Sequence, residues 1–185
     1  MGKSLYAVGS YKEYDMNNRF FNINLAGGAL LDIGVYALSL MRSFMAETPD
    51  QVMSQVRFAP TGTDEQASII LMNKEQQMAA ITLSMHSKQP KRAMISCEKG
   101  YIEIMEYPRA DKAIIVDAAS GAVTPVEAGE TKRALEYEMR DMEEAVQSGD
   151  VSRMQMPFTR DVMNIMTDLR KNLGLVYPEE SGKTE

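Results

Sequence analysis

The middle of the chain is a series of extended stretches joined by very short links, and no other feature restricts the fold as strongly. The links, such as Pro60-Thr61-Gly62 and Lys99-Gly100, are short enough to join antiparallel neighbours. The pattern therefore predicts a mostly antiparallel, meander-like sheet. Its strand-forming residues lie at 51–59, 67–73, 77–86, 92–98, 101–107 and 112–118, with a seventh candidate at 122–127.

Helices are predicted before and after this region. Residues 4–11 are typical of a strand, and residues 29–44 of a largely buried helix in which apolar side chains surround one polar stripe. Further on, apolar residues recur at helical spacing along 135–146 and 157–173, and a glycine follows each stretch. This order predicts an α+β domain with helices packed on one face of an open, mostly antiparallel sheet.

The chain has the length and composition of a single globular domain. It has 185 residues, of which 44% are hydrophobic and 25% charged. We therefore expect one domain over residues 1–178, followed by a loose, charged tail at 179–185.

The charge and the cysteine content exclude several classes of protein. A formal net charge of -6 argues against nucleic acid as a partner, because binding to phosphates needs a clustered basic face. The single cysteine, Cys97, cannot form an internal disulfide, and we expect it to be a small core residue. No signal peptide, membrane span or set of metal ligands around His86 is predicted, so a cytoplasmic protein without a metal is expected.

One segment carries residues suited to chemistry. Asp32 and Tyr36 stand four residues apart in the predicted helix, so their side chains share one helical face and can reach one small polar ligand. Gly34 between them, and Gly27 and Gly28 before the helix, suggest places where a group approaches the backbone closely. The alternative is purely structural: Asp32 then complements the helix dipole and Tyr36 is a core aromatic.

The sequence around this segment resembles a known family. Gly-Gly-Ala-Leu-Leu-Asp-Ile-Gly-Val-Tyr at 27–36, preceded by Asn18-Arg19, is similar to a signature of the Gfo/Idh/MocA oxidoreductases. Glu-Lys-Gly-Tyr-Ile-Glu-Ile at 98–104 and the closing Leu-Gly-Leu-Val-Tyr-Pro-Glu also resemble their C-terminal domain. That resemblance implies the C-terminal domain fold of the glyceraldehyde-3-phosphate-dehydrogenase-like type. The tyrosine variant is similar to the branch with glucose-fructose oxidoreductase and dihydrodiol dehydrogenase.

The resemblance implies roles for individual residues. In the family a hydride passes between a nicotinamide and a carbinol carbon, so Tyr36 would transfer the hydroxyl proton and Asp32 would orient the substrate or Tyr36. Free tyrosine ionises near about pH 10, so a tyrosine base at neutral pH needs a positive charge nearby. Arg19 matches an arginine in this loop of the family, which would contact the cofactor, contact the substrate or only support the fold. The substrate would be carbohydrate-like, and Gly27, Gly28 and Gly34 would let it approach.

Two parts of the family's active site are missing from this sequence. It contains neither the Glu-Lys-Pro motif that supplies a catalytic lysine nor the Gly-x-Gly-x-x-Gly turn that holds a dinucleotide. We therefore predict that the N-terminal Rossmann domain is absent, that the isolated chain is inactive and that it binds no cofactor. NAD or NADP would serve the full-length protein.

Two other hypotheses remain open. A non-catalytic ligand-binding or regulatory protein could use the same scaffold, and an unrelated α+β domain could use the glycines and Asp32 only to begin a helix. In the oxidoreductase interpretation, the domain also carries oligomer contacts. Because one sheet face is expected to be exposed, we predict a homodimer or tetramer through that face.

Overall fold

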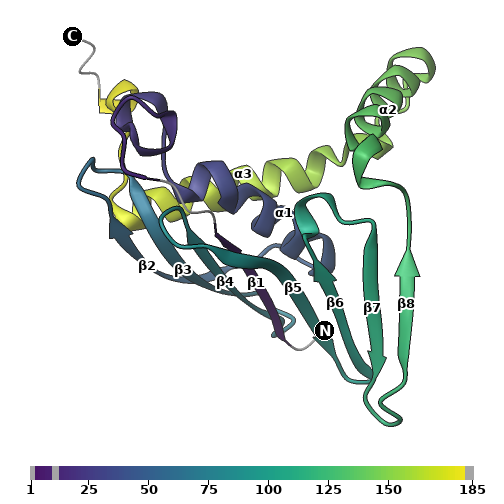
Figure 1. The fold of residues 1–185 in the computed structure, drawn as a ribbon. Helices are drawn as coiled ribbons and strands as arrows, with labels where there is room; N and C mark the ends of the chain where they lie inside the picture. The colour runs from purple at the N-terminus through teal and green to yellow at the C-terminus, as the bar shows by residue number, and fades with distance from the viewer. Residues whose placement is uncertain (1–2, 10–12, 182–185) are drawn as a thin grey trace.

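The computed structural model describes residues 3–9 and 13–181 and shows one eight-stranded sheet with helices over one face (Figure 1). The six predicted strands in the middle of the chain and the seventh candidate are all present. The predicted first strand is also present, but its positions 10–11 lie outside the described residues. The predicted α+β class is confirmed. The strands are β1 (Lys3–Gly9), β2 (Gln51–Phe58), β3 (Asp64–Met72), β4 (Met78–Ser84), β5 (Gln89–Cys97), β6 (Gly100–Met105), β7 (Lys112–Asp117) and β8 (Val123–Glu127).

The strand order is β2-β3-β4-β1-β5-β6-β7-β8. All pairs are antiparallel except β1 with β4, which is parallel. The predicted meander is therefore wrong at one point, because β1 lies between β4 and β5. Residues 85–88 join those two strands, and four residues suffice to cross one intervening strand, a distance of roughly 10 Å. A short link is compatible with pairing but does not require it.

The predicted helix at 29–44 is present but begins with a different geometry. Its first turn, Leu30–Gly34, is a π-helix, and the α-helix α1 continues from Val35 to Phe44. The other two helices are α2 (Ala134–Ser148) and α3 (Met156–Leu173), and each ends at a glycine with a left-handed backbone. Short π turns inside α-helices are common at functional sites.

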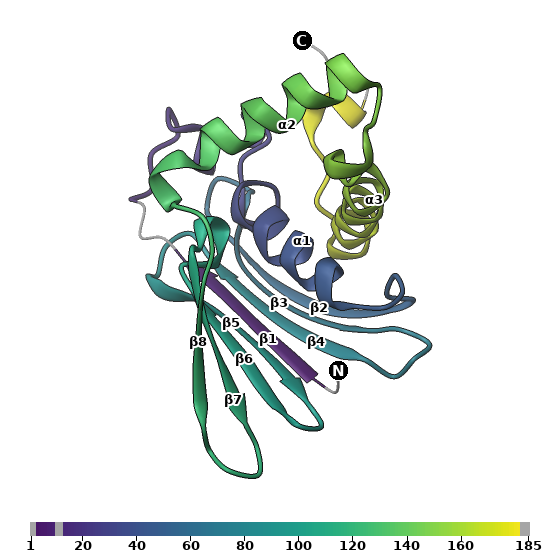
Figure 2. The ribbon, with the colours of Figure 1, turned by 90° about the vertical axis from the view of Figure 1, so that its right-hand side faces the viewer.

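The core lies between the sheet and the helices α1 and α3, which run side by side over it (Figure 2). Leu38 and Met41 of α1 and Leu169 of α3 are fully buried there. By length and composition the stretch Ile23–Phe44, with a mean hydropathy of 1.5, is comparable to a membrane span. The burial of its apolar side chains in this core accounts for that composition.

Helix α2 stands away from the sheet on the helix side (Figures 1 and 2). Its predicted apolar stripe is present but uncovered: Leu135, Met139, Met142 and Val146 are all exposed, and only Ala145 is buried. Helical spacing of apolar residues indicates a face that needs a partner, but not that the partner belongs to the same chain.

Two further predictions concern Cys97, at the end of β5, and the C-terminal tail. Cys97 is exposed at the end of β5, so the prediction of a core cysteine is wrong. Alternation places it on the same face as the buried Ala93 and Ile95, but it is the last residue of the strand, where the burial of that face ends. In the predicted loose tail, Glu180 pairs with Arg170 of α3 at 2.6 Å, and residues 182–185 lie outside the described part.

Candidate functional site

The helix that carries Asp32 and Tyr36 begins against strand β3. The backbone N–H of Leu30 donates to Asp64 Oδ2 at 2.6 Å, and Asp64 is fully buried. Gly28 makes this contact possible: its φ is 127°, and a Cβ atom there would lie 1.8 Å from Asp64 Oδ1. A carboxylate at a helix N-terminus satisfies free amides, so Asp64 fixes where the helix starts.

Burial changes the chemistry of that carboxyl group. Removal from water raises the pKa of Asp64 to about 7, although hydrogen bonds from Leu30 and Ala29 oppose the rise. Its Oδ1 atom has no hydrogen-bond partner among the described residues. The protonated and ionised forms are therefore both accessible near neutral pH.

The other two glycines of the motif also face protein atoms. A Cβ at Gly27 would lie 2.3 Å from the carbonyl oxygen of Arg19, and one at Gly34 would lie 2.9 Å from a methyl of Leu83. The Tyr177 hydroxyl donates to the carbonyl of Gly27 at 3.2 Å. In the structure, the close approach is thus made by the chain itself, and a ligand role for these glycines stays a prediction.

Asp32 is paired with Arg19. The Arg19 guanidinium donates to Asp32 Oδ1 at 2.6 Å, and its carbon lies 4.4 Å from the centre of the Phe20 ring. The Arg19 side chain is 61% exposed and that of Asp32 17%. The sequence placed both residues in the site separately, and the structure joins them.

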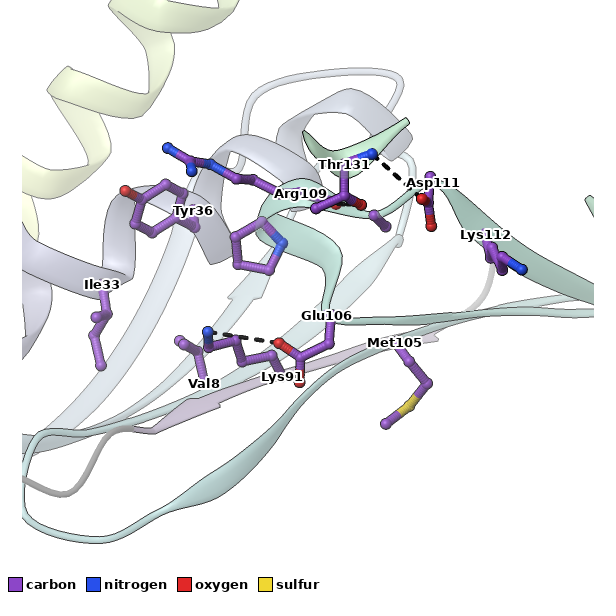
Figure 3. A pocket seen from close by; sticks show the side chains of 12 residues that line it. Val8, Ile33, Tyr36, Lys91, Met105, Glu106, Arg109, Asp111, Lys112 and Thr131 are labelled. Atoms are coloured by element: carbon purple, nitrogen blue, oxygen red, sulfur yellow. Dashed lines mark hydrogen bonds and ion pairs between the residues drawn. The ribbon is translucent and has the colours of Figure 1, made fainter. Parts of the chain in front are cut away.

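Tyr36 occupies a different setting from Asp32. Its side chain lines a cleft of about 720 Å³ between the motif helix and the turn after β6, and the residue is 47% exposed (Figure 3). Asp32 is not among the residues that line this cleft. The apolar part of the wall is formed by Val8, Ile33, Met105, Pro108 and Ala110.

The cleft also contains charged residues that the sequence analysis did not single out. Lys91 pairs with Glu106 at 3.5 Å, and Lys112 with Glu127 at 3.2 Å. Arg109 forms no ion pair among the described residues, and it extends toward the Tyr36 ring (Figure 3). Sequence alone suggested only a turn here, because Arg109 lies 73 positions from Tyr36 and nothing in its spacing joins the two.

No group of three or more metal-ligating side chains is found in residues 3–9 and 13–181. His86 instead stacks on the Tyr14 ring, with the ring centres 4.3 Å apart. The geometry offers a phenol, a cationic side chain and an apolar wall, which suit a small organic ligand.

An open sheet with a glycine-led Asp-x-Gly-x-Tyr helix beside a cleft defines the C-terminal domain of a class of oxidoreductases. The family model described as GFO/IDH/MocA C-terminal domain matches residues 2–103, and the chain belongs to this family. The resemblance noted in the sequence is confirmed.

Curated relatives are dehydrogenases. The chain is 26% identical over 167 residues to trans-1,2-dihydrobenzene-1,2-diol dehydrogenase of Danio rerio, a match that covers 85% of this chain and 50% of the relative. It is 25% identical over 165 residues to the enzyme of the same name from Mus musculus, covering 85% and 49%. The chain thus spans about half the length of the curated relatives it matches.

Solved structures share the fold at low sequence identity. A 3-ketoreductase from Actinomadura kijaniata, in complex with NADP and TDP-benzene, matches with a TM-score of 0.77 and 15% identity over 91% of this chain and 53% of that one. UDP-N-acetylglucosamine 3-dehydrogenase from Acidithiobacillus ferrooxidans matches with a TM-score of 0.75 and 13% identity, covering 92% and 53%. Both confirm the predicted fold of a C-terminal oxidoreductase domain.

Proposed function

We propose that this chain is the substrate-side half of an NAD(P)-dependent oxidoreductase that oxidises or reduces a carbinol carbon of a carbohydrate-like or diol substrate. The observation that carries the proposal is Tyr36, half-exposed on the wall of an apolar cleft, on the helix that bears the family motif. The names of the relatives support the substrate class, since they act on a diol or on nucleotide-linked sugars.

In the proposed chemistry, a residue of this chain, Tyr36, transfers the proton of the substrate hydroxyl. When the substrate hydroxyl is oxidised, its O–H proton passes to the Tyr36 oxygen while the C–H hydride goes to the nicotinamide. In the reverse direction Tyr36 donates that proton to the carbonyl oxygen. Asp32, held by Arg19, orients the substrate or the phenol from the same helix.

We propose that the cofactor is bound outside this chain. The sequence lacks a Gly-x-Gly-x-x-Gly turn. In the described residues the sheet has one parallel strand pair, β1 with β4, and their connection runs through α1, β2 and β3 rather than through the single helix of a dinucleotide fold. Arg19 is the one residue proposed to contact the cofactor, and its 61% exposed side chain is accessible for that contact. NAD or NADP would therefore be bound by a nucleotide-binding half outside the chain.

The uncovered stripe on α2 supports a missing half. A helix of 15 residues is marginal in water without tertiary contacts, so exposed side chains such as Met139 and Val146 suit burial against another domain. We propose that this domain is the nucleotide-binding half and that the isolated chain has no turnover. A cytoplasmic location is part of the same proposal.

Self-association is proposed through the sheet face opposite the helices. Cross-strand neighbours form an apolar row on this face, in which Met53 is 72%, Ile70 45% and Leu5 40% exposed. Such a row is suited to an isologous contact with a second copy, which supports a homodimer or tetramer.

The test of the function is turnover after the missing half is supplied. The chain would be joined to, or mixed with, the proposed nucleotide-binding half, and nicotinamide reduction would be followed with trans-dihydrodiols and sugars. We expect turnover in the assembled protein and none with the 185-residue chain alone. Turnover by the chain alone, or none in any assembly, would contradict the proposal.

A second candidate is a non-catalytic ligand-binding protein on the same scaffold. The observation that favours it is the Asp32 carboxylate, which pairs with Arg19 and does not line the cleft. Ligand binding without nicotinamide reduction, in the assembled protein, would favour this candidate over the enzyme.

A further inference from the structure

We infer that Arg109 selects a substrate bearing an anionic group, a carboxylate or a phosphate, and holds it in the cleft beside Tyr36. The inference rests on the proposed function, since it names the substrate class of the same site. It depends on three observations: the rigidity of the turn that carries Arg109, the lack of a partner for its charge, and the apolar surroundings.

The backbone of Arg109 is held on both sides. It is the last residue of a short 3-10 turn, Tyr107–Arg109, and its N–H donates to the carbonyl of Glu106 at 3.1 Å. Its own carbonyl accepts a hydrogen bond from the Thr131 hydroxyl at 2.7 Å. A fixed backbone limits the region that the side chain can reach, and this region includes the cleft that it lines.

The same turn is anchored in the core. Tyr107 is 7% exposed, and its ring meets the buried Tyr6 ring edge to face, with the centres 6.5 Å apart. The position of Arg109 relative to strand β1 is therefore set by packing, and not only by a surface loop.

Arg109 has no carboxylate within ion-pair distance among the described residues, unlike the two lysines of the cleft. Lys91 and Lys112 both have carboxylate partners, and the Asp111 carboxylate accepts a hydrogen bond from the backbone of Thr131. Arg109 is in none of the ion pairs found in the part of the chain that the structure describes. The cleft is lined by three cations, Lys91, Arg109 and Lys112, and by two acids, Glu106 and Asp111, so an anion that enters it meets an excess of positive charge.

The form of the guanidinium defines the ligand chemistry. Its planar fork of N–H donors matches the two oxygens of a carboxylate or phosphate, and such bidentate contacts are strong and directional. Apolar walls from Val8, Ile33 and Pro108 offer packing surface for the uncharged part of such a ligand. A substrate that places its anion on Arg109 would bring a neighbouring carbinol carbon toward Tyr36.

The experiment measures ligand binding to the 185-residue chain by NMR, without nicotinamide. The δ1-methyl signal of Ile33, which lines the cleft, would be assigned with Ile33→Val and titrated with glucose, glucuronate and glucose-6-phosphate at constant ionic strength. We expect an anionic sugar to bind at least about tenfold more tightly than glucose, as charged hydrogen bonds provide. The tighter of the two anions identifies carboxylate or phosphate as the preferred group.

Three variants separate the role of Arg109 from general charge. Arg109→Ala should remove the preference for the anion, Arg109→Gln should do the same while keeping a polar, uncharged side chain, and Lys74→Ala, an exposed cation on another loop, should keep it. Equal binding of glucose and both anions, or an unchanged preference in Arg109→Ala and Arg109→Gln, would overturn the inference. The hydride-transfer proposal fails separately, on the turnover of the assembled protein.

Discussion

The carboxylate of Asp64, at the first position of β3, accepts a hydrogen bond of 2.6 Å from the backbone N–H of Leu30, at the first turn of the motif helix. The two residues are 34 positions apart in the sequence. Through this contact, a buried acid on the sheet sets the start of the helix that carries Asp32 and Tyr36.

The first prediction concerns pH. Because burial raises the pKa of Asp64 from 3.8 to about 7, the folded state binds this proton more tightly than the unfolded state. The stability it contributes is present below about pH 4 and lost as the pH rises through about 7. We expect the free energy of unfolding to fall by a few kcal/mol across this window, since each pKa unit is worth about 1.4 kcal/mol.

Urea unfolding at about pH 5 and about pH 8 measures this effect. Asp64→Asn keeps an acceptor for Leu30 but carries no charge, so its stability should change much less between the two pH values. Asp50→Asn, at an exposed carboxyl, should behave like the parent chain. Carboxyls with lowered pKa values, such as Glu136 at about 2, titrate below the window. An equal change in the free energy of unfolding between the two pH values, for Asp64→Asn and for the parent, would refute the assignment of the pH dependence to Asp64.

The second prediction concerns Gly28. Alanine at this position combines a strained φ of 127° with a Cβ 1.8 Å from the Asp64 carboxylate, so we expect a loss of about 2 kcal/mol or more. Gly62→Ala is the matched control: its φ is 86°, but no atom lies within 4 Å of the added Cβ. It should cost only about 1 kcal/mol of backbone strain. Equal losses in the two variants would show that the contact with Asp64 adds nothing.

Local patterns in the sequence predicted the elements well, and long-range relationships poorly. The alternation in β3 and the glycine ends of α2 and α3 depend on neighbouring residues, so their positions follow from sequence. The insertion of β1 between β4 and β5 depends on a pairing between segments 75 positions apart, such as Lys3 with Met78. No local signal encodes such a pairing.

The residues of the candidate site likewise fall into those that the sequence could identify and those that it could not. Asp32 and Tyr36 could be singled out because they share a helix, whereas Arg109 reaches the cleft only through the packing of the turn after β6. Gly28 was recognised as a place of close approach, but the group that approaches it is Asp64, from another strand. A glycine in the sequence can indicate that another group lies close to the backbone, but it cannot identify that group.

The third prediction tests self-association. Ile70→Lys places a charge in the middle of the apolar row on the open sheet face, so it should shift a dimer or tetramer to monomer. Val151→Lys, at an apolar residue that is 59% exposed outside the sheet, should leave the assembly unchanged. Sedimentation velocity over a range of concentrations checks both. A parent chain that is monomeric at high concentration would contradict the proposed interface.

The fourth prediction concerns the pair between Arg19 and Asp32. The pair is partly exposed, so Arg19→Ala should change the free energy of unfolding by less than about 1 kcal/mol. In the assembled protein, it should nevertheless lower kcat/KM, because Asp32 loses the group that orients it. Lys171→Ala, an exposed cation at the end of α3, serves as the control. Unchanged kcat/KM in Arg19→Ala would leave the pair with no role in the site.

The last prediction addresses Tyr36 in the assembled protein. Tyr36→Phe removes the oxygen that exchanges a proton with the substrate, so turnover should fall by more than tenfold, a loss within the range of general acid–base catalysis. The residue is half-exposed, so the fold and the ligand affinity of the cleft should be retained. Tyr101→Phe, on β6 and outside the residues that line the cleft, should keep full activity. If Tyr36→Phe turns over substrate at the parent rate, the proton must follow another route, and the cleft would then bind the substrate without contributing the acid or base.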